Sequence, residues 1–104
     1  MSDPKELMVC NLLIEAIESR KLPMLNMKLE INSIIAHTGY QDNDLPPKYF
    51  IKVLGKCGVI TSYYRANLRD INKSLTRLIG LRTQLENELY YDNKRSKAQA
   101  TQAS

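Results

Sequence analysis

The stretch that decides the fold is residues 62–92, SYYRANLRDINKSLTRLIGLRTQLENELYYD. Its apolar residues recur at alternating steps of four and three, which places their side chains along one side of a continuous helix. The pattern extends over about four heptads and contains no proline, so it predicts one long helix with an apolar seam. The residues on this seam are Tyr64, Leu68, Ile71, Leu75, Leu78, Leu85 and Leu89, and Arg82 is the one that is not apolar.

A helix of this length predicts self-association. At about 1.5 Å per residue it would be about 45 Å long, and shorter helices upstream could not cover its whole seam. We therefore expect a homodimer in which the seams of two copies pack together, with Arg82 setting register and orientation by reaching Glu86 or Glu88 of the second copy. The expected interface consists of Leu68, Ile71, Leu75, Leu78, Arg82, Leu85 and Leu89.

Three shorter helices are expected upstream of the long one. Asp3 and Pro4 form an N-cap and a first-turn proline, Gly39 ends the second helix, and Pro46 or Pro47 begins the third. The predicted fold is therefore all-α, with three short N-terminal helices of helix-turn-helix type followed by one long, coiled-coil-like C-terminal helix. Residues 1–93 form one domain in this prediction, with a three-helix head over 3–60 and a dimerisation helix over 61–93.

The last residues have a different composition. Residues 94–104 contain no aromatic or branched aliphatic side chain and are rich in Lys, Gln, Ala, Thr and Ser. Such a segment buries too little apolar surface to offset the entropy of ordering it. We expect a disordered basic tail, in which Lys94, Arg95 and Lys97 add weak electrostatic attraction.

The charge of the chain is unevenly distributed. The net charge is +4, but residues 1–47 hold four Lys/Arg against seven Asp/Glu, whereas residues 48–104 hold eleven against four. A basic half concentrates positive potential on one surface, where it attracts phosphate or an acidic protein. Charge alone does not distinguish these two partners.

Two rows of cations step by four residues within the basic half. Lys48, Lys52 and Lys56 form a stripe on the third expected helix, and Arg65, Arg69, Lys73 and Arg77 form a ribbon beside the seam. An apolar helix, a glycine-containing turn and a helix with cations on its outer face resemble a helix-turn-helix reader of DNA. Gly58-Val59-Ile60 resembles the exit into the short strand of winged-helix proteins, so a minimal wing is an open alternative here. The expected phosphate contacts are Lys48, Lys52, Lys56, Arg65, Arg69, Lys73 and Arg77.

Tyrosines lie near these cations. Tyr49 and Tyr63 are candidates for stacking on bases or hydrogen bonding to phosphate. The other interpretation is ordinary packing with the hydroxyl group at the surface. The third helix has no Arg, Asn or Gln to read base edges, so its lysines would hold phosphate rather than specify sequence.

The sequence gives little support to other classes of function. There is no glycine-rich phosphate loop, no GxSxG and no HExxH, so we do not expect an enzyme. Cys10, Cys57 and His37 do not have the spacing of a zinc site, and we expect no metal and no cofactor. The cysteines are interpreted as reduced core thiols of a cytoplasmic protein, or a nuclear one in a eukaryote. No apolar stretch reaches the length of about 20 residues that a membrane helix needs.

Two functions from different classes remain. The first is a small dimeric DNA-binding protein that regulates transcription or replication. The second is a non-enzymatic helical adaptor, chaperone or inhibitor that binds an acidic or helical protein.

Overall fold

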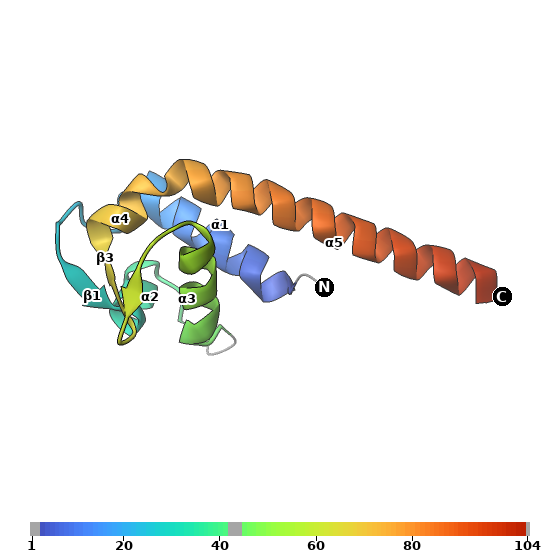
Figure 1. Cartoon of the computed structure of the whole chain (residues 1–104), viewed down its shortest axis with the longest axis horizontal. Coiled ribbons are helices and arrows are strands. Elements are labelled where there is room, and N and C mark those ends of the chain that lie inside the picture. The colour runs from blue at the N-terminus through green and yellow to red at the C-terminus, as the bar shows by residue number, and fades with distance from the viewer. Residues whose placement is uncertain (1–2, 42–44, 104) are drawn as a thin grey trace.

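The computed structural model describes residues 3–41 and 45–103, and the side chains of these residues up to Tyr91. A compact head carries one long helix that runs past it (Figure 1). The elements in chain order are α1 (Pro4–Glu18), β1 (Lys28–Glu30), α2 (Ile31–His37), α3 (Pro47–Lys56), β2 (Thr61–Ser62), β3 (Arg65–Asn67), α4 (Leu68–Lys73) and α5 (Leu75–Ala103).

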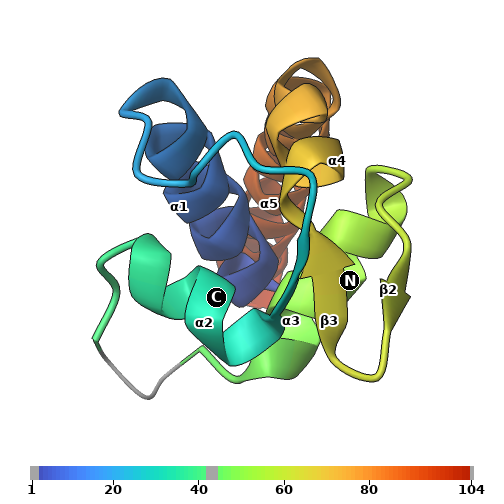
Figure 2. The same ribbon diagram turned by 90° about the vertical axis from the view of Figure 1, so that its left-hand side faces the viewer.

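The prediction of an all-α fold is wrong, because the described residues form five helices and a small antiparallel sheet. The strand order is β1-β3-β2, so the hairpin formed by β2 and β3 is joined to the strand that precedes α2 (Figure 2). Ala66 on β3 lies between Leu29 on β1 and Thr61 on β2 and is fully buried. Strands of two or three residues are too short for alternation to reveal them in a sequence.

The hairpin turns through two tyrosines. Tyr63 and Tyr64 have φ angles of 52° and 58°, so both central residues of the two-residue turn lie in the left-handed region. Asn-Gly is the preferred pair at such a turn. A bulky residue in the left-handed region costs about 1 kcal/mol or more. The turn is therefore formed at the expense of stability.

The predicted long helix is wrong at its start and is interrupted. Residues 61–67 form the hairpin, so Tyr64 lies in a turn rather than on the seam. The backbone N–H of Arg69 donates to the Asn67 side chain at 2.8 Å, which caps the short helix α4. Ser74 separates α4 from α5, and its hydroxyl donates to the Asp70 carbonyl at 2.7 Å. Serine bonds of this kind bend helices.

The apolar seam packs inside the chain. α5 runs antiparallel to α1 and lies along it (Figure 1). Both helices contribute to one core that also includes Phe50, Val53 and Leu54 of α3. Four of the residues expected at a dimer interface are fully or almost fully buried in this core, namely Leu68, Ile71, Leu78 and Leu85, whereas Leu75, Arg82 and Leu89 are half-buried.

Within one chain, Arg82 already has an acidic neighbour. Its Nε lies 3.9 Å from Oε1 of Glu86, one turn further along α5. The side chain of Glu88 accepts a hydrogen bond from Gln84 at 3.1 Å. The carboxylates that we expected Arg82 to reach on a second copy therefore have partners on their own helix.

The backbone of the segment predicted to be a disordered tail is helical. The helix α5 continues to Ala103, beyond the end of order expected near residue 93. Residues 94–103 are Ala, Lys, Gln and Arg for the most part, and these residues have high intrinsic helix propensity. A lack of apolar residues predicts a lack of packing, but it does not by itself end a helix that has already begun.

The two cysteines are free and buried, as predicted. Removal from water raises the pKa of the Cys10 thiol to about 12, and burial also raises the pKa of Cys57. Both thiols are therefore protonated at neutral pH and act as small apolar side chains of the core.

Leu78 and Leu85 should behave as core residues of a single chain. We expect Leu78→Ala and Leu85→Ala each to lower the free energy of unfolding by about 2–5 kcal/mol, measured by urea denaturation. Leu89→Ala, on the same helix but half-buried, should cost less than half as much. A loss that disappears at high protein concentration would instead place these leucines between two copies.

Candidate nucleic-acid interface

The lysine stripe of α3 lies against the N-terminal part of α1. Nζ of Lys52 and Nζ of Lys56 lie 3.1 and 3.3 Å from the same oxygen, Oε1 of Glu6. Glu6 is only 3% exposed, whereas the side chains of Lys52 and Lys56 are 59% and 41% exposed. Two ammonium groups therefore hold one buried carboxylate and still face solvent.

This cluster keeps a positive surplus. Glu6 neutralises one of the two lysines that contact it, and Lys48 adds a further positive charge one turn earlier on α3. The Nζ of Lys48 lies 5.3 Å from the centre of the Tyr49 ring, and that of Lys5 lies 5.6 Å from it. The predicted stripe is therefore a cationic surface, but two of its members also hold α1 to α3.

Tyr49 has a structural role that the sequence did not indicate. Its hydroxyl group hydrogen-bonds to Asp3, the residue that caps α1, and this bond raises the pKa of Tyr49. The pKa of Asp3 is lowered, first by the backbone N–H of Lys5 and then by Tyr49. Tyr49 is half-buried, with its hydroxyl on Asp3 and its ring beside the ammonium groups of Lys5 and Lys48.

The second row of cations is not one helical ribbon, which corrects the sequence-based prediction. Arg65 belongs to β3, Arg69 and Lys73 to α4, and Arg77 to α5 beyond the break at Ser74. Arg65 and Asn67 alternate with the buried Ala66, so they lie on the outer face of the sheet. Lys28 is paired with Asn67 on the same face. Lys28 lies far from both rows of cations in the sequence, so its spacing did not mark it as a candidate.

Arg77 binds the end of α3. Its Nη1 donates to the carbonyl oxygen of Cys57 at 3.0 Å, which supplies a cation to the C-terminal end of that helix. Gly58 has φ of 80°, and a Cβ at this position would come within 2.5 Å of Nη1. Arg77 also lines a polar pocket of about 250 Å³ together with Gly58, Asp70, Lys73 and Ser74.

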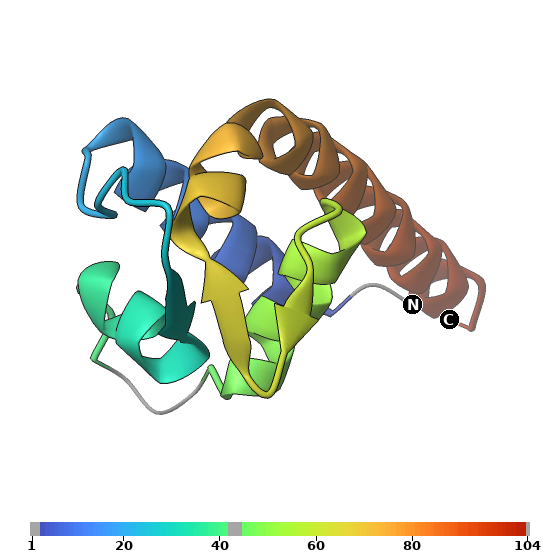
Figure 3. The ribbon, with the colours of Figure 1, turned by 60° about the vertical axis from the view of Figure 1, so that its left-hand side comes forward.

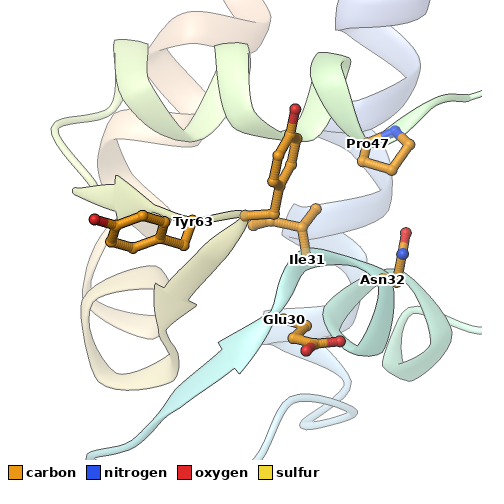
Figure 4. A pocket seen from close by; sticks show the side chains of 6 residues that line it. Glu30, Ile31, Asn32, Pro47 and Tyr63 are labelled. Carbon is orange, nitrogen blue, oxygen red and sulfur yellow. The ribbon is translucent and has the colours of Figure 1, made fainter.

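The hairpin tip forms the wall of a second pocket. Tyr63 is 94% exposed and Tyr64 69%, and the carbonyl of Tyr64 accepts a hydrogen bond from the N–H of Ile31 at 2.7 Å. This bond fixes the tip to the start of α2. The pocket has a volume of about 290 Å³ and is lined by Glu30, Ile31, Asn32, Pro47, Tyr63 and Tyr64 (Figure 4).

The tip and α3 are neighbours in space. β2 contacts α3, and the hairpin runs beside that helix (Figure 3). Pro47, the first residue of α3, lines the same pocket as Tyr63 and Tyr64. Lys48 and the hairpin tip therefore lie at one end of the molecule, which brings two of the predicted contact residues, Lys48 and Tyr63, to a common surface. Tyr64 belongs to this surface too, although its spacing from Leu68 had assigned it to the seam.

The described residues contain no group of three or more His, Cys, Asp or Glu side chains that could hold a metal ion. In the same part of the chain, no helix is both long and apolar enough to cross a membrane.

Comparisons with protein families, with curated proteins and with solved structures find no match to this chain. The candidate function therefore depends on the geometry of α3, the sheet and the hairpin tip.

Arg77 should stabilise the fold, in contrast to its neighbour in the same row. We expect Arg77→Ala to lower the free energy of unfolding by about 1 kcal/mol, because it removes a charged donor from the Cys57 carbonyl. Lys73→Ala removes the same charge one turn away on α4 and should change stability by less than about 0.5 kcal/mol. Equal effects in urea denaturation would show that the bond to Cys57 contributes nothing.

Proposed function

We propose that this protein binds duplex DNA through α3 and the hairpin and acts as a non-enzymatic regulator of transcription or replication. The observation that carries the proposal is the common surface made by the cationic first turn of α3 and the exposed hairpin tip. The order of helix, strand, two helices and a hairpin also resembles the winged helix-turn-helix architecture. In helix-turn-helix proteins the second helix of the motif lies in the major groove.

The chemistry of α3 favours contacts with phosphate over contacts with base edges. Its exposed residues are Lys48, Lys52, Gly55 and Lys56, and none is the Arg, Asn or Gln that reads a base pair with two hydrogen bonds. Lys28, Arg65 and Arg69 add cations along the sheet and α4. Binding of this kind varies little with sequence and weakens steeply with salt.

Glu6 limits the strength of such binding. A phosphate that approaches Lys52 or Lys56 competes with the carboxylate that already holds them. Replacing Glu6 by glutamine would free both ammonium groups while keeping nearly the same volume. Because Glu6 is buried, its charge stays close to the lysines and is screened little by salt.

Salt-dependent binding to duplex DNA tests the proposal. We expect Lys52→Ala to weaken binding to all sequences similarly and to reduce the salt slope by about one unit. Arg65→Ala should do the same, and Glu6→Gln should act in the opposite direction by raising affinity at low salt. Fluorescence anisotropy with a labelled duplex at several salt concentrations measures these effects.

Lys21→Ala is the matched control, because it removes one charge at the other end of α1 from Glu6. If Lys21→Ala weakens binding as much as Lys52→Ala does, the attraction is not localised on α3. A folded protein that binds no duplex even at low salt would contradict the proposal and favour the adaptor function.

The adaptor function has its own supporting observation. The loop after α1 exposes Met24 (76%), Leu25 (51%) and Met27 (44%). Neighbouring apolar side chains on a surface mark sites of protein association. An acidic or helical protein would be the partner in this second candidate function.

A homodimer remains part of the proposal, but with a different surface. With Leu78 and Leu85 buried in one chain, the available apolar residues of α5 are Ile79 and Tyr90, which lie on the flank beside them. These residues are spaced so that they share one side of the helix. α5 also extends past the N-terminal end of α1, which leaves this flank uncovered there (Figure 1).

Sedimentation should distinguish the two surfaces. We expect a reversible dimer that Ile79→Lys weakens without unfolding the chain, because Ile79 is 38% exposed. Gln84→Lys, on an exposed side of the same helix that points away from Ile79 and Tyr90, is the control and should leave the dimer unchanged. A monomer at every concentration tested would refute the dimer.

A further inference from the structure

The two tyrosines of the hairpin tip have a backbone conformation that bulky residues disfavour, and their side chains are exposed to solvent. Tyr63 and Tyr64 both have positive φ and are both exposed. Burial does not compensate for the conformation, since most of each ring faces water. Strained backbone conformations occur preferentially at binding sites, and two large rings at the turn point to a ligand that contacts them.

The pocket beside the tip has the chemistry of a site for a planar, partly polar group. Ile31 and Pro47 provide apolar walls, and Tyr63 lies on the opposite side of the pocket from Pro47 and Asn32 (Figure 4). Glu30 and Asn32 add a carboxylate and an amide to the lining. The Glu30 side chain makes no capping hydrogen bond to α2, although it occupies the N-cap position.

The lining of the pocket carries a negative charge, whereas the residues that flank the pocket carry positive charges. Glu30 places a negative charge in the lining, which disfavours a phosphate there. Lys48 follows Pro47 on one side, and Arg65 follows Tyr64 on the other, directly opposite Glu30 in the strand register. A nucleotide strand satisfies this pattern, with its base in the pocket and its phosphates on the two cations. A cationic peptide would be repelled by Lys48 and Arg65.

We propose that the pocket at the hairpin tip binds a single unpaired nucleobase that carries an exocyclic amino group. Tyrosine rings stack on bases of any kind, and a glutamate accepts a hydrogen bond from the amino group of cytosine. Thymine lacks this group and presents an oxygen to Glu30 instead. The inference rests on the proposed function, because the cations that bind duplex DNA also hold the strand that bears the base.

Duplexes with one extra unpaired base test the inference. We expect wild-type protein to bind a duplex containing one bulged cytosine about tenfold more tightly than the perfect duplex, since base–tyrosine stacking adds to the phosphate contacts. A bulged thymine should give a smaller gain. Glu30→Gln should remove the difference between cytosine and thymine, while affinity for the perfect duplex should not fall.

The double variant Tyr63→Asn/Tyr64→Gly separates the role of the rings from that of the fold. It installs the pair that this turn prefers, so we expect its Tm to rise by about 4 °C or more while the preference for the bulged duplex is lost. Tyr91→Ala, which removes an exposed tyrosine from α5, is the matched control and should keep that preference.

The outcomes distinguish this inference from the proposed function. Salt-dependent binding of the perfect duplex with no gain from a bulged base overturns the nucleobase site and leaves duplex binding in place. A preference that survives in Tyr63→Asn/Tyr64→Gly also overturns it. Failure to bind any of these DNAs overturns both.

Discussion

The packing of α5 on α1 is the constraint on which the rest of the structure depends. Leu78 and Leu85 are buried in the same core as Val9, Cys10 and Leu13, so the C-terminal helix packs against the N-terminal one. This arrangement covers one side of the head, and α2, the sheet and α3 complete the others (Figure 2). The face that presents Lys48 and the hairpin tip is left open as a result.

The heptad pattern in the sequence identified buried residues correctly but could not identify what buries them. Leu68, Ile71, Leu78 and Leu85 do face a core, and an apolar stripe looks the same whether it packs on α1 or on a second copy. Tyr64 matched the spacing by coincidence, because a hairpin of three-residue strands has no periodicity long enough to compete with a helical one.

The sequence predicted part of the candidate site, but not the contacts between residues that are distant in the sequence. Spacing correctly placed Lys52 and Lys56 on one side of α3, but their shared partner Glu6 lies far away in the sequence and only tertiary structure brings it there. Arg77 shared a spacing with Arg65 and Arg69 and yet binds the end of α3. The pocket at the hairpin tip could not be predicted from the sequence, because it joins residues from β1, α2, α3 and the turn between β2 and β3.

Three attachments fix the orientation of α3. Glu6 holds it to α1 through two lysines, Arg77 of α5 bonds to the carbonyl of its C-cap residue Cys57, and the shared core holds α1 and α5 to each other. Each of the three helices is thus held to the other two, and α3 cannot rotate about its own axis without breaking a polar contact. A ligand of α3 meets a preorganised helix, so association loses little conformational entropy in ordering it.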